Sequence, residues 1–318
     1  MWISPYKYVL SLGHLYSDIN QSILSAVLPF LIATYHYDYT TAAMLVTVSN
    51  VFGAFVQPFI GMLSDKKNKL LYMTLGVLLA SGGMVVTGFI SNFFGLCIAV
   101  IMSGIGVVMF HPQAAKLVNS VSSKNAKGKG MSIFSFGGKV GFTLGPVYTA
   151  FLMNLFGMKG TILFLIPGIV FGIVCSFFNK DFENLDVLEV EKKEKVKSEQ
   201  KDDWSGFIKL CCVVFSRSIL SNGISTFLAF YFIQQFSKSN SFASMLLSVF
   251  YGIGSITLLG GGIADCFGHR KMVRLSFCIF LPAIFIFTNT SHFVIALIML
   301  IFMTCGESLS YSPMVVLG

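Results

Sequence analysis

Apolar residues occur along this chain in long runs, and short polar or charged stretches separate the runs. Each run has about 20 residues, the length of a helix that crosses ~30 Å of hydrocarbon. Backbone groups inside a bilayer must pair within their own segment, so the runs are predicted to be helices rather than barrel strands. The expected spans are 8–35, 40–63, 70–90, 93–118, 131–156, 161–178, 207–234, 242–264, 272–288 and 292 to the end.

Composition supports the same class of protein. Charged residues make up 11% of the chain and hydrophobic residues 55%, with a mean hydropathy of +0.78. Soluble domains carry roughly 25% charged residues, so this chain is expected to be an integral membrane protein. The seven cysteines are scattered through the apolar runs without metal-ligand spacing, and no metal or cofactor is expected. No cleavable signal peptide is expected, because the first run keeps Asp18 inside it.

Residues 179–204 differ from the runs on either side, since Asp and Glu alternate there with Lys and apolar periodicity is almost absent. Such a stretch is predicted to be a solvated linker on the cytoplasmic side. It divides the chain into an N-terminal half of six helices, residues 1–178, and an incomplete C-terminal half of about four helices, residues 205–318.

Two charged turns between apolar runs indicate an internal repeat with an offset of about 200 residues. In each turn small residues allow close helix contact, an Asp ends one helix, and basic residues follow. The residues of this conformational motif are Gly61, Asp65, Lys66 and Lys69 in the first turn and Gly261, Asp265 and Arg270 in the second. Pro112 and Pro313 show a similar offset. Two parallel copies of one unit, related by an axis along the membrane normal, are therefore expected.

Basic residues gather in alternate loops, which include both charged turns and the linker. The positive-inside rule places these loops and the N-terminus in the cytoplasm, so we expect a multi-pass protein of the inner (plasma) membrane. The basic residues are accounted for by orientation, and nucleic acid is not an expected partner. The expected partners are a small-molecule substrate, protons and the lipid bilayer.

The two turns and four further stretches carry a resemblance to a known family. The stretches are Gly13-His14-x-x-x-Asp18 with Leu28-Pro29-Phe30, Gly104-x-Gly106 with Phe110-His111-Pro112, Gly137-Gly138-x-x-Gly141 with Gly145-Pro146, and Arg217-Ser218. The turns resemble those of the major facilitator superfamily, and the stretches resemble the fosmidomycin resistance protein family within it. This resemblance implies an all-α membrane bundle of two pseudo-symmetric six-helix halves, with about ten of the twelve helices present. It also implies proton-driven efflux of a drug or metabolite.

The chain departs from the pattern of that family in two ways. The family has twelve helices, whereas this chain stops near the tenth, so Asp65 is expected to lack the helix end against which it packs. Lys139 stands where the resemblance leads us to expect a neutral polar residue.

Ionisable residues within the apolar runs are the candidate functional residues, because a charge in the bilayer costs roughly 2.5–3.5 kcal/mol on insertion scales. Asp18 is expected to titrate and couple proton flow to transport, or alternatively to be a structural partner of Lys139 or of nearby polar groups. His111 is a second candidate for proton coupling, since imidazole titrates near neutral pH. A buried imidazole satisfied by hydrogen bonds is the alternative for His111.

Arg217 is the main candidate for substrate binding, because its planar guanidinium suits a carboxylate or phosphonate. The alternative is that it extends toward the cytoplasmic end of its helix. Lys139, His14 and Gln21 are further candidates for substrate binding, and Glu307 could complement a cation in the second half. The small residues of the fifth run are expected to form a helix-packing motif. They are Gly137, Gly138, Gly141, Gly145 and Pro146.

The sequence thus favours a secondary active transporter that exports a small, fosmidomycin-like drug or metabolite by alternating access, coupled to protons. Uptake of a sugar or organic acid is the first alternative. A truncated membrane protein that does not transport is the second. An enzyme is not expected, because the sequence shows no nucleophile–base pair or metal cluster.

Overall fold

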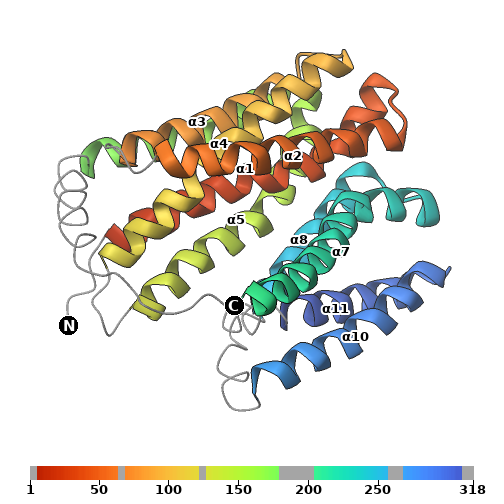
Figure 1. Ribbon diagram of the computed structural model, residues 1–318. Helices are drawn as coiled ribbons and strands as arrows, with labels where there is room; N and C mark the ends of the chain where they lie inside the picture. Colours follow the sequence, from red (N-terminus) through yellow and green to blue (C-terminus); the bar gives the residue numbers. More distant parts are fainter. Residues whose placement is uncertain (1–5, 64–68, 122–126, 179–203, 257–267, 310–318) are drawn as a thin grey trace. The chain divides into compact units, whose positions relative to one another are not determined.

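The computed structural model describes residues 6–63, 69–121, 127–178, 204–256 and 268–309, and every regular element in these ranges is a helix (Figure 1). The chain divides into two compact units, Met1–Lys197 and Ser198–Gly318. Among the described residues, six helical segments are long and apolar enough to cross a bilayer, and shorter apolar helices cover Leu70–Val86 and Phe293–Leu309. The all-α membrane fold expected from the sequence is therefore confirmed.

The helices of the first unit follow the apolar runs closely. They are α1 (Tyr6–Tyr35), α2 (Tyr39–Leu63), α3 (Lys69–Val86), α4 (Phe93–Ser120), α5 (Lys127–Phe156), the 3-10 helix η2 (Gly157–Phe164) and a helix over 165–178. In the second unit they are α7 (Trp204–Phe236), α8 (Asn240–Ile256), α10 (His269–Asn289) and α11 (Phe293–Leu309).

Several predicted boundaries differ from the structure by a few residues, and two of these differences lie near one end of the first unit. The third span was expected to reach residue 90, but α3 ends at Val86. Asn92 caps α4 by accepting a hydrogen bond from the Gly95 N–H at 2.7 Å, so the chain must leave the helical conformation before it. The sixth span was expected to start at Thr161, but this residue lies in η2, where its hydroxyl donates to the Val85 carbonyl at 2.9 Å.

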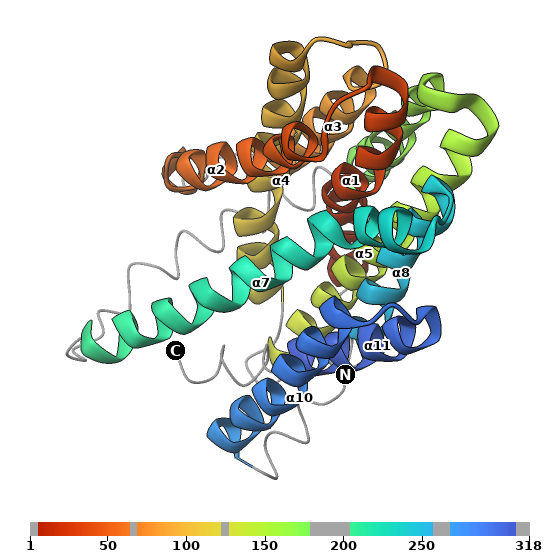
Figure 2. The ribbon, with the colours of Figure 1, turned by 90° about the vertical axis from the view of Figure 1, so that its right-hand side faces the viewer.

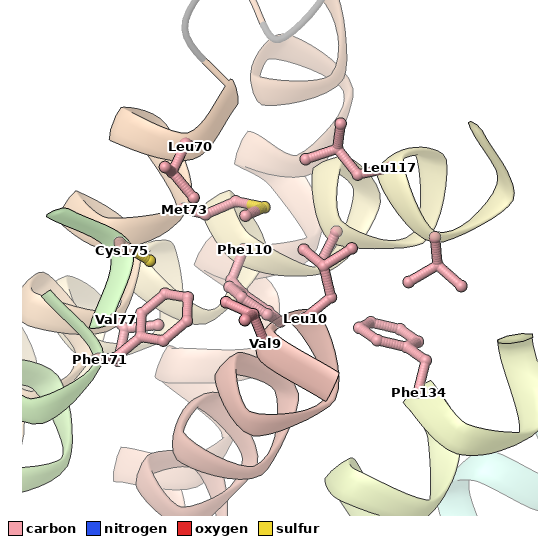
Figure 3. Packing of buried hydrophobic residues seen from close by; sticks show 12 residues of the cluster. Val9, Leu10, Leu70, Met73, Val77, Phe110, Leu117, Phe134, Phe171 and Cys175 are labelled. Carbon is pink, nitrogen blue, oxygen red and sulfur yellow. The ribbon is translucent and has the colours of Figure 1, made fainter. Parts of the chain in front are cut away.

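Helix α1 is the centre of the first unit. It packs most extensively on α5 and also contacts α4, α3 and α2. A cluster of buried apolar side chains from α3, α4, α5 and the helix over 165–178 packs around its N-terminal part (Figure 3). The cluster includes Leu10 of α1, Phe110 of α4, Phe134 of α5 and Phe171 of the helix over 165–178. This apolar packing fixes the positions of the polar side chains that α1 carries one turn further on.

Close contact between α1 and α5 depends on the glycines of α5. A Cβ atom at Gly137 would meet the Ser11 carbonyl, and one at Gly141 would meet the Leu15 carbonyl. Small residues at three- and four-residue spacing let helix backbones approach in this way inside membranes.

Similar glycine contacts recur in the two units. Gly106 of α4 lies against the backbone of Ala80 in α3, and Gly306 of α11 lies against the backbone of Phe280 in α10. Both residues of the second contact follow those of the first by about 200 positions. The pair α10 and α11, side by side in both views, is thus the counterpart of α3 and α4 (Figure 1 and Figure 2).

The first loop of each unit repeats as well. His36 and Ser237 each end a helix with a positive φ, 56° and 50°. Asp38 then caps α2 and Ser239 caps α8, each accepting a hydrogen bond from the N–H three residues on, at 2.8 and 3.3 Å. These parallels support the internal repeat that the charged turns indicated.

Several predicted residues lie outside the described ranges. They are Asp65, Lys66, Gly261, Asp265 and Pro313, together with the linker over 179–203. Of the same conformational motif, Gly61 lies in the last turn of α2, Lys69 begins α3, and Arg270 lies in the first turn of α10.

Candidate functional site

Asp18 lies near the middle of α1 and is only 3% exposed. A lone carboxylate there would cost several kcal/mol. Two imidazoles compensate this cost. His14 Nε2, from the preceding turn of α1, lies 3.2 Å from Oδ2, and His111 Nε2, from α4, lies 3.1 Å from Oδ1. Both carboxylate oxygens therefore contact a ring nitrogen, and the three residues form what we call the His–Asp–His cluster.

The local sequence explains how the cluster forms. His14 and Asp18 are four residues apart and share one face of α1. On α4, His111 is followed by Pro112, which lacks an N–H and interrupts the helical hydrogen bonds at this point. On α5, a Cβ at Gly138 would lie 2.5 Å from Asp18 Oδ2 and 2.6 Å from His14 Cε1. Only glycine leaves room for the cluster at that position.

The imidazole ring of His14 is held on two sides. Its Nδ1 lies 2.8 Å from the carbonyl oxygen of Phe134, and the ring stacks on the Phe134 side chain with centroids 4.0 Å apart. The centroid of the Phe110 ring lies 6.3 Å from that of the His14 ring. The orientation of this ring is thus set by the apolar cluster of Figure 3 and by one backbone carbonyl.

Access to the cluster differs among its members. The His111 side chain is 35% exposed, His14 15% and Asp18 4%. Among the described residues, His111 Nδ1 has no hydrogen-bond partner, and the same holds for Asp18 Oδ1, the buried Ser17 hydroxyl and the Gln113 amide. Each buried polar atom without a partner lowers the stability of the fold, so these polar side chains of α1 and α4 are not explained by stability alone.

Two further predicted residues lie near the cluster. Lys139 follows Gly138 on α5, is half-buried, and lies within electrostatic range of His14. It also has interactions of its own. Gln21 is exposed on α1, one turn beyond Asp18. The structure therefore brings His14, Asp18, His111 and Lys139 together.

The glycine motif of α5 faces this region of α1. Besides the contacts described above, a Cβ at Gly145 would meet the Ser22 side chain. Pro146 follows inside the helix and is buried. The motif thus lies along the same α1 segment that carries the His–Asp–His cluster.

The second unit has a buried ion pair of a different kind. Arg217 of α7 pairs through Nη2 with Glu307 Oε1 of α11, and the two side chains are 15% and 11% exposed. The same Nη2 lies 3.4 Å from the Glu307 carbonyl, and the Ser308 hydroxyl donates to Oε2 at 3.3 Å. Glu307 was expected to complement a cation in the second half, and the structure shows that this cation is Arg217. The signal was an acidic residue inside an apolar run.

The His–Asp–His cluster also has residue types that coordinate divalent metals, and its ligand atoms lie within 4.8 Å of one another. The sequence did not suggest a metal cluster, because His111 comes from a distant helix. The Nε2–O distances of 3.1 and 3.2 Å bring both rings directly against the carboxylate, so we interpret the cluster as one that holds protons.

The sequence model of the Major Facilitator Superfamily matches residues 10–318. This chain belongs to the Major Facilitator Superfamily. As a member of this superfamily it is a multi-pass membrane transporter of small molecules rather than an enzyme. The resemblance inferred from the motifs is thereby confirmed.

Two curated relatives illustrate the relationship within the superfamily. The fosmidomycin resistance protein of Escherichia coli (strain K12) is 24% identical over 276 residues, which cover 83% of this chain and 66% of the relative. An uncharacterized MFS-type transporter, YfnC of Bacillus subtilis (strain 168), is 24% identical over 85% of this chain and 68% of its own. The chain thus spans about two thirds of the length of these relatives.

Solved structures show the same fold. A bacterial homolog of the human lysosomal transporter Spinster, inward-facing and occupied, superposes with a TM-score of 0.81 at 15% identity and covers 98% of this chain and 73% of its own. A D-xylose–proton symporter superposes with a TM-score of 0.75 at 14% identity and covers 98% and 81%. At these identities the likeness concerns the fold alone.

Proposed function

We propose that this superfamily member is a secondary active transporter that exports a small drug or metabolite in exchange for protons. The observation that carries the proposal is the His–Asp–His cluster. Intramembrane ionisable residues are costly, and in transporters they mark substrate and proton pathways. A buried carboxylate with an imidazole beside each oxygen is a site where a proton can be bound and released.

The arrangement also suits coupling to movement. The cluster draws its members from α1 and α4, and Gly138 of α5 closes it. Small shifts among these three helices would change the Nε2–O distances, and with them the affinity for a proton. The glycine contacts between α1 and α5 would let the helices move, as alternating access requires.

Substrate binding is proposed for Arg217, Lys139, His14 and Gln21. Arg217 already binds a carboxylate, that of Glu307, so an anionic substrate would exchange with this side chain. Export is favoured over uptake by the relatives that are named for resistance, the fosmidomycin resistance protein and a multidrug resistance protein of Rahnella, 25% identical over half of this chain.

The orientation is proposed from the charges of the loops. The N-terminus, the linker and both charged turns would face the cytoplasm of a cell with this protein in its inner membrane. Asp65 and Asp265, at the two turns, would act in the conformational change.

Proton-coupled uptake is the second candidate function. The D-xylose–proton symporter shares the fold, and a probable hexose phosphate transport protein of Chlamydia pneumoniae is 23% identical over 53% of this chain. Both functions place the proton in the same cluster and differ in the direction of the substrate.

Transport in proteoliposomes tests the proposal. The complete protein, including any residues encoded beyond position 318, is reconstituted, and labelled fosmidomycin or xylose is offered under an imposed pH gradient. We expect fosmidomycin to move against the proton flow in the wild type. Xylose moving with the protons would favour uptake. If the transport rates of both compounds are the same with an inward, an outward or no pH gradient, proton coupling is contradicted.

A further inference from the structure

Both ring nitrogens of His14 face hydrogen-bond acceptors. Nδ1 lies 2.8 Å from the Phe134 carbonyl oxygen, which can only accept, so Nδ1 carries a hydrogen. A neutral imidazole has one N–H, and this contact uses it. Nε2 would then present a lone pair to Asp18 Oδ2 at 3.2 Å. Two lone pairs in contact at a buried site repel each other, so the geometry requires one additional proton between Nε2 and Oδ2.

His111 does not require such a proton. Its Nε2 lies 3.1 Å from Asp18 Oδ1, and a neutral ring with its hydrogen on Nε2 already directs an N–H toward the carboxylate. Among the described residues, its Nδ1 has no hydrogen-bond partner, so no acceptor calls for a second hydrogen there. The additional proton is therefore shared by His14 and Asp18.

The surroundings decide on which of the two atoms the proton resides. His111 Nε2, 3.1 Å from Oδ1, places a polar N–H beside the carboxylate, and such a neighbour favours the ionised form of Asp18. Imidazole is also a stronger base than carboxylate. With the proton on His14, an imidazolium lies beside a carboxylate and the cluster has no net charge.

We infer that the exchangeable proton of the cluster resides on Nε2 of His14, and that Asp18 remains ionised and positions both imidazoles. This assignment rests on the proposed proton coupling and refines it, because it moves His14 from substrate binding to the proton site. Three ionisable groups act on His14: Asp18 on α1, His111 on α4, whose ring centroid lies 5.1 Å away, and Lys139 on α5.

The assignment has a consequence for coupling. When the proton leaves His14, the carboxylate of Asp18 remains buried without its cation, and Lys139 is the nearby positive charge on α5. Release of the proton therefore favours approach of α5 side chains to α1. Because the glycines of α5 hold its backbone against α1, a change in the Lys139 side chain alone is enough to bring its charge toward Asp18.

Nitrogen NMR on the complete protein, labelled with ¹⁵N-histidine in lipid nanodiscs, tests the assignment. The His14 signals are those that disappear in His14→Gln. We expect both ring nitrogens to be protonated at neutral pH, and the ring to become neutral with its hydrogen on Nδ1 as the pH rises. The control is His292→Gln, which removes an exposed histidine and should leave the His14 titration unchanged. A neutral His14 together with an infrared carboxylic acid band that disappears in Asp18→Asn would overturn the assignment.

Transport separates this inference from the proposed function. His14→Gln is expected to lose the pH dependence of fosmidomycin transport, whereas His292→Gln keeps it. If wild-type transport does not depend on the pH gradient but NMR shows both ring nitrogens of His14 protonated, the proposed function is wrong and the assignment of the proton to His14 is correct. If transport is gradient-driven but His14 is neutral throughout, the inference alone fails.

Discussion

The two units of this transporter bury charge in contrasting ways. In the first unit, Asp18 contacts two imidazoles, each of which is charged only when it is protonated. In the second, Glu307 contacts the guanidinium of Arg217, which stays charged at any physiological pH. In the proposed function, the first arrangement gains and loses a proton while it stays buried. The second is a permanent pair that joins α7 to α11.

The contrast is informative because the surrounding helices are otherwise parallel. The counterparts Gly106 and Gly306 make the same kind of backbone contact, and the first loop of each unit has the same cap. The units thus share their packing but differ in the chemistry placed on it. We therefore assign the proton to the first unit and a fixed charge, suited to an anionic group, to the second.

The largest expected effect comes from removing the carboxylate of the first unit. Asp18→Asn leaves His14 and His111 without the negative charge that favours a bound proton. We expect gradient-driven fosmidomycin transport to fall to background, as measured in proteoliposomes. Asp38→Asn is the matched control, since this carboxyl is exposed in the loop before α2, and it should retain transport. Equal losses of transport in both variants would show that the buried carboxylate of Asp18 has no special role.

In the second unit, replacing one residue of the ion pair should lower the stability of the protein more than replacing both residues. Glu307→Gln leaves the Arg217 charge buried and poorly compensated, and breaking a buried pair costs about 3–5 kcal/mol. Arg217→Leu combined with Glu307→Leu should cost less than the single change. Thermal unfolding in detergent measures both. A double variant less stable than Glu307→Gln would show that the pair is not the dominant interaction of these side chains.

A methyl group placed against the cluster should have an intermediate effect. Gly138→Ala puts a Cβ 2.5 Å from Asp18 Oδ2, and overpacking of this kind costs about 1–3 kcal/mol. We expect lower thermal stability and an altered pH profile of transport. Gly82→Ala in α3 is the control, because a Cβ there meets nothing within 4 Å. It should keep the wild-type pH profile, and an unchanged profile in Gly138→Ala as well would argue against tight packing of the cluster.

The smallest expected effect distinguishes the two capped loops. Hydrogen bonds from Thr41 lower the pKa of the Asp38 carboxyl below its ordinary value. A carboxyl whose pKa is lowered in the folded state stabilises the fold at pH values above its ordinary pKa. This contribution disappears as the pH falls through the folded-state pKa. The hydroxyl of Ser239 does not titrate. Amide hydrogen exchange, corrected for its intrinsic pH dependence, should therefore speed up at Thr41 but not at Phe242 in acid, and parallel behaviour would refute the difference.

Much of the fold could be predicted because the bilayer imposes it. The lengths of the apolar runs gave the helices to within a few residues in most cases. The exceptions, the end of α3 and the 3-10 helix η2, depend on hydrogen bonds of Asn92 and Thr161 that hydrophobicity does not report.

The candidate site was only partly predictable. Asp18, His111 and Arg217 attract attention because each is an ionisable residue in an apolar run. Their partners do not follow from the sequence, since His111 reaches Asp18, and Glu307 reaches Arg217, across helices distant along the chain. The sequence offered Lys139 or nearby polar groups as structural partners of Asp18, and the direct contacts come from His14 and His111. The His14 position depends on a single backbone carbonyl, which no sequence pattern marks.

Counting protons during transport tests the central claim most directly. The complete protein is reconstituted with a pH-sensitive dye inside the liposomes, and an outward gradient of fosmidomycin is applied with no initial pH difference. The account predicts that the liposome interior acidifies as fosmidomycin leaves, and that Asp18→Asn abolishes this acidification. Fosmidomycin efflux without any pH change in the wild type, or equal acidification in wild type and Asp18→Asn, would contradict it.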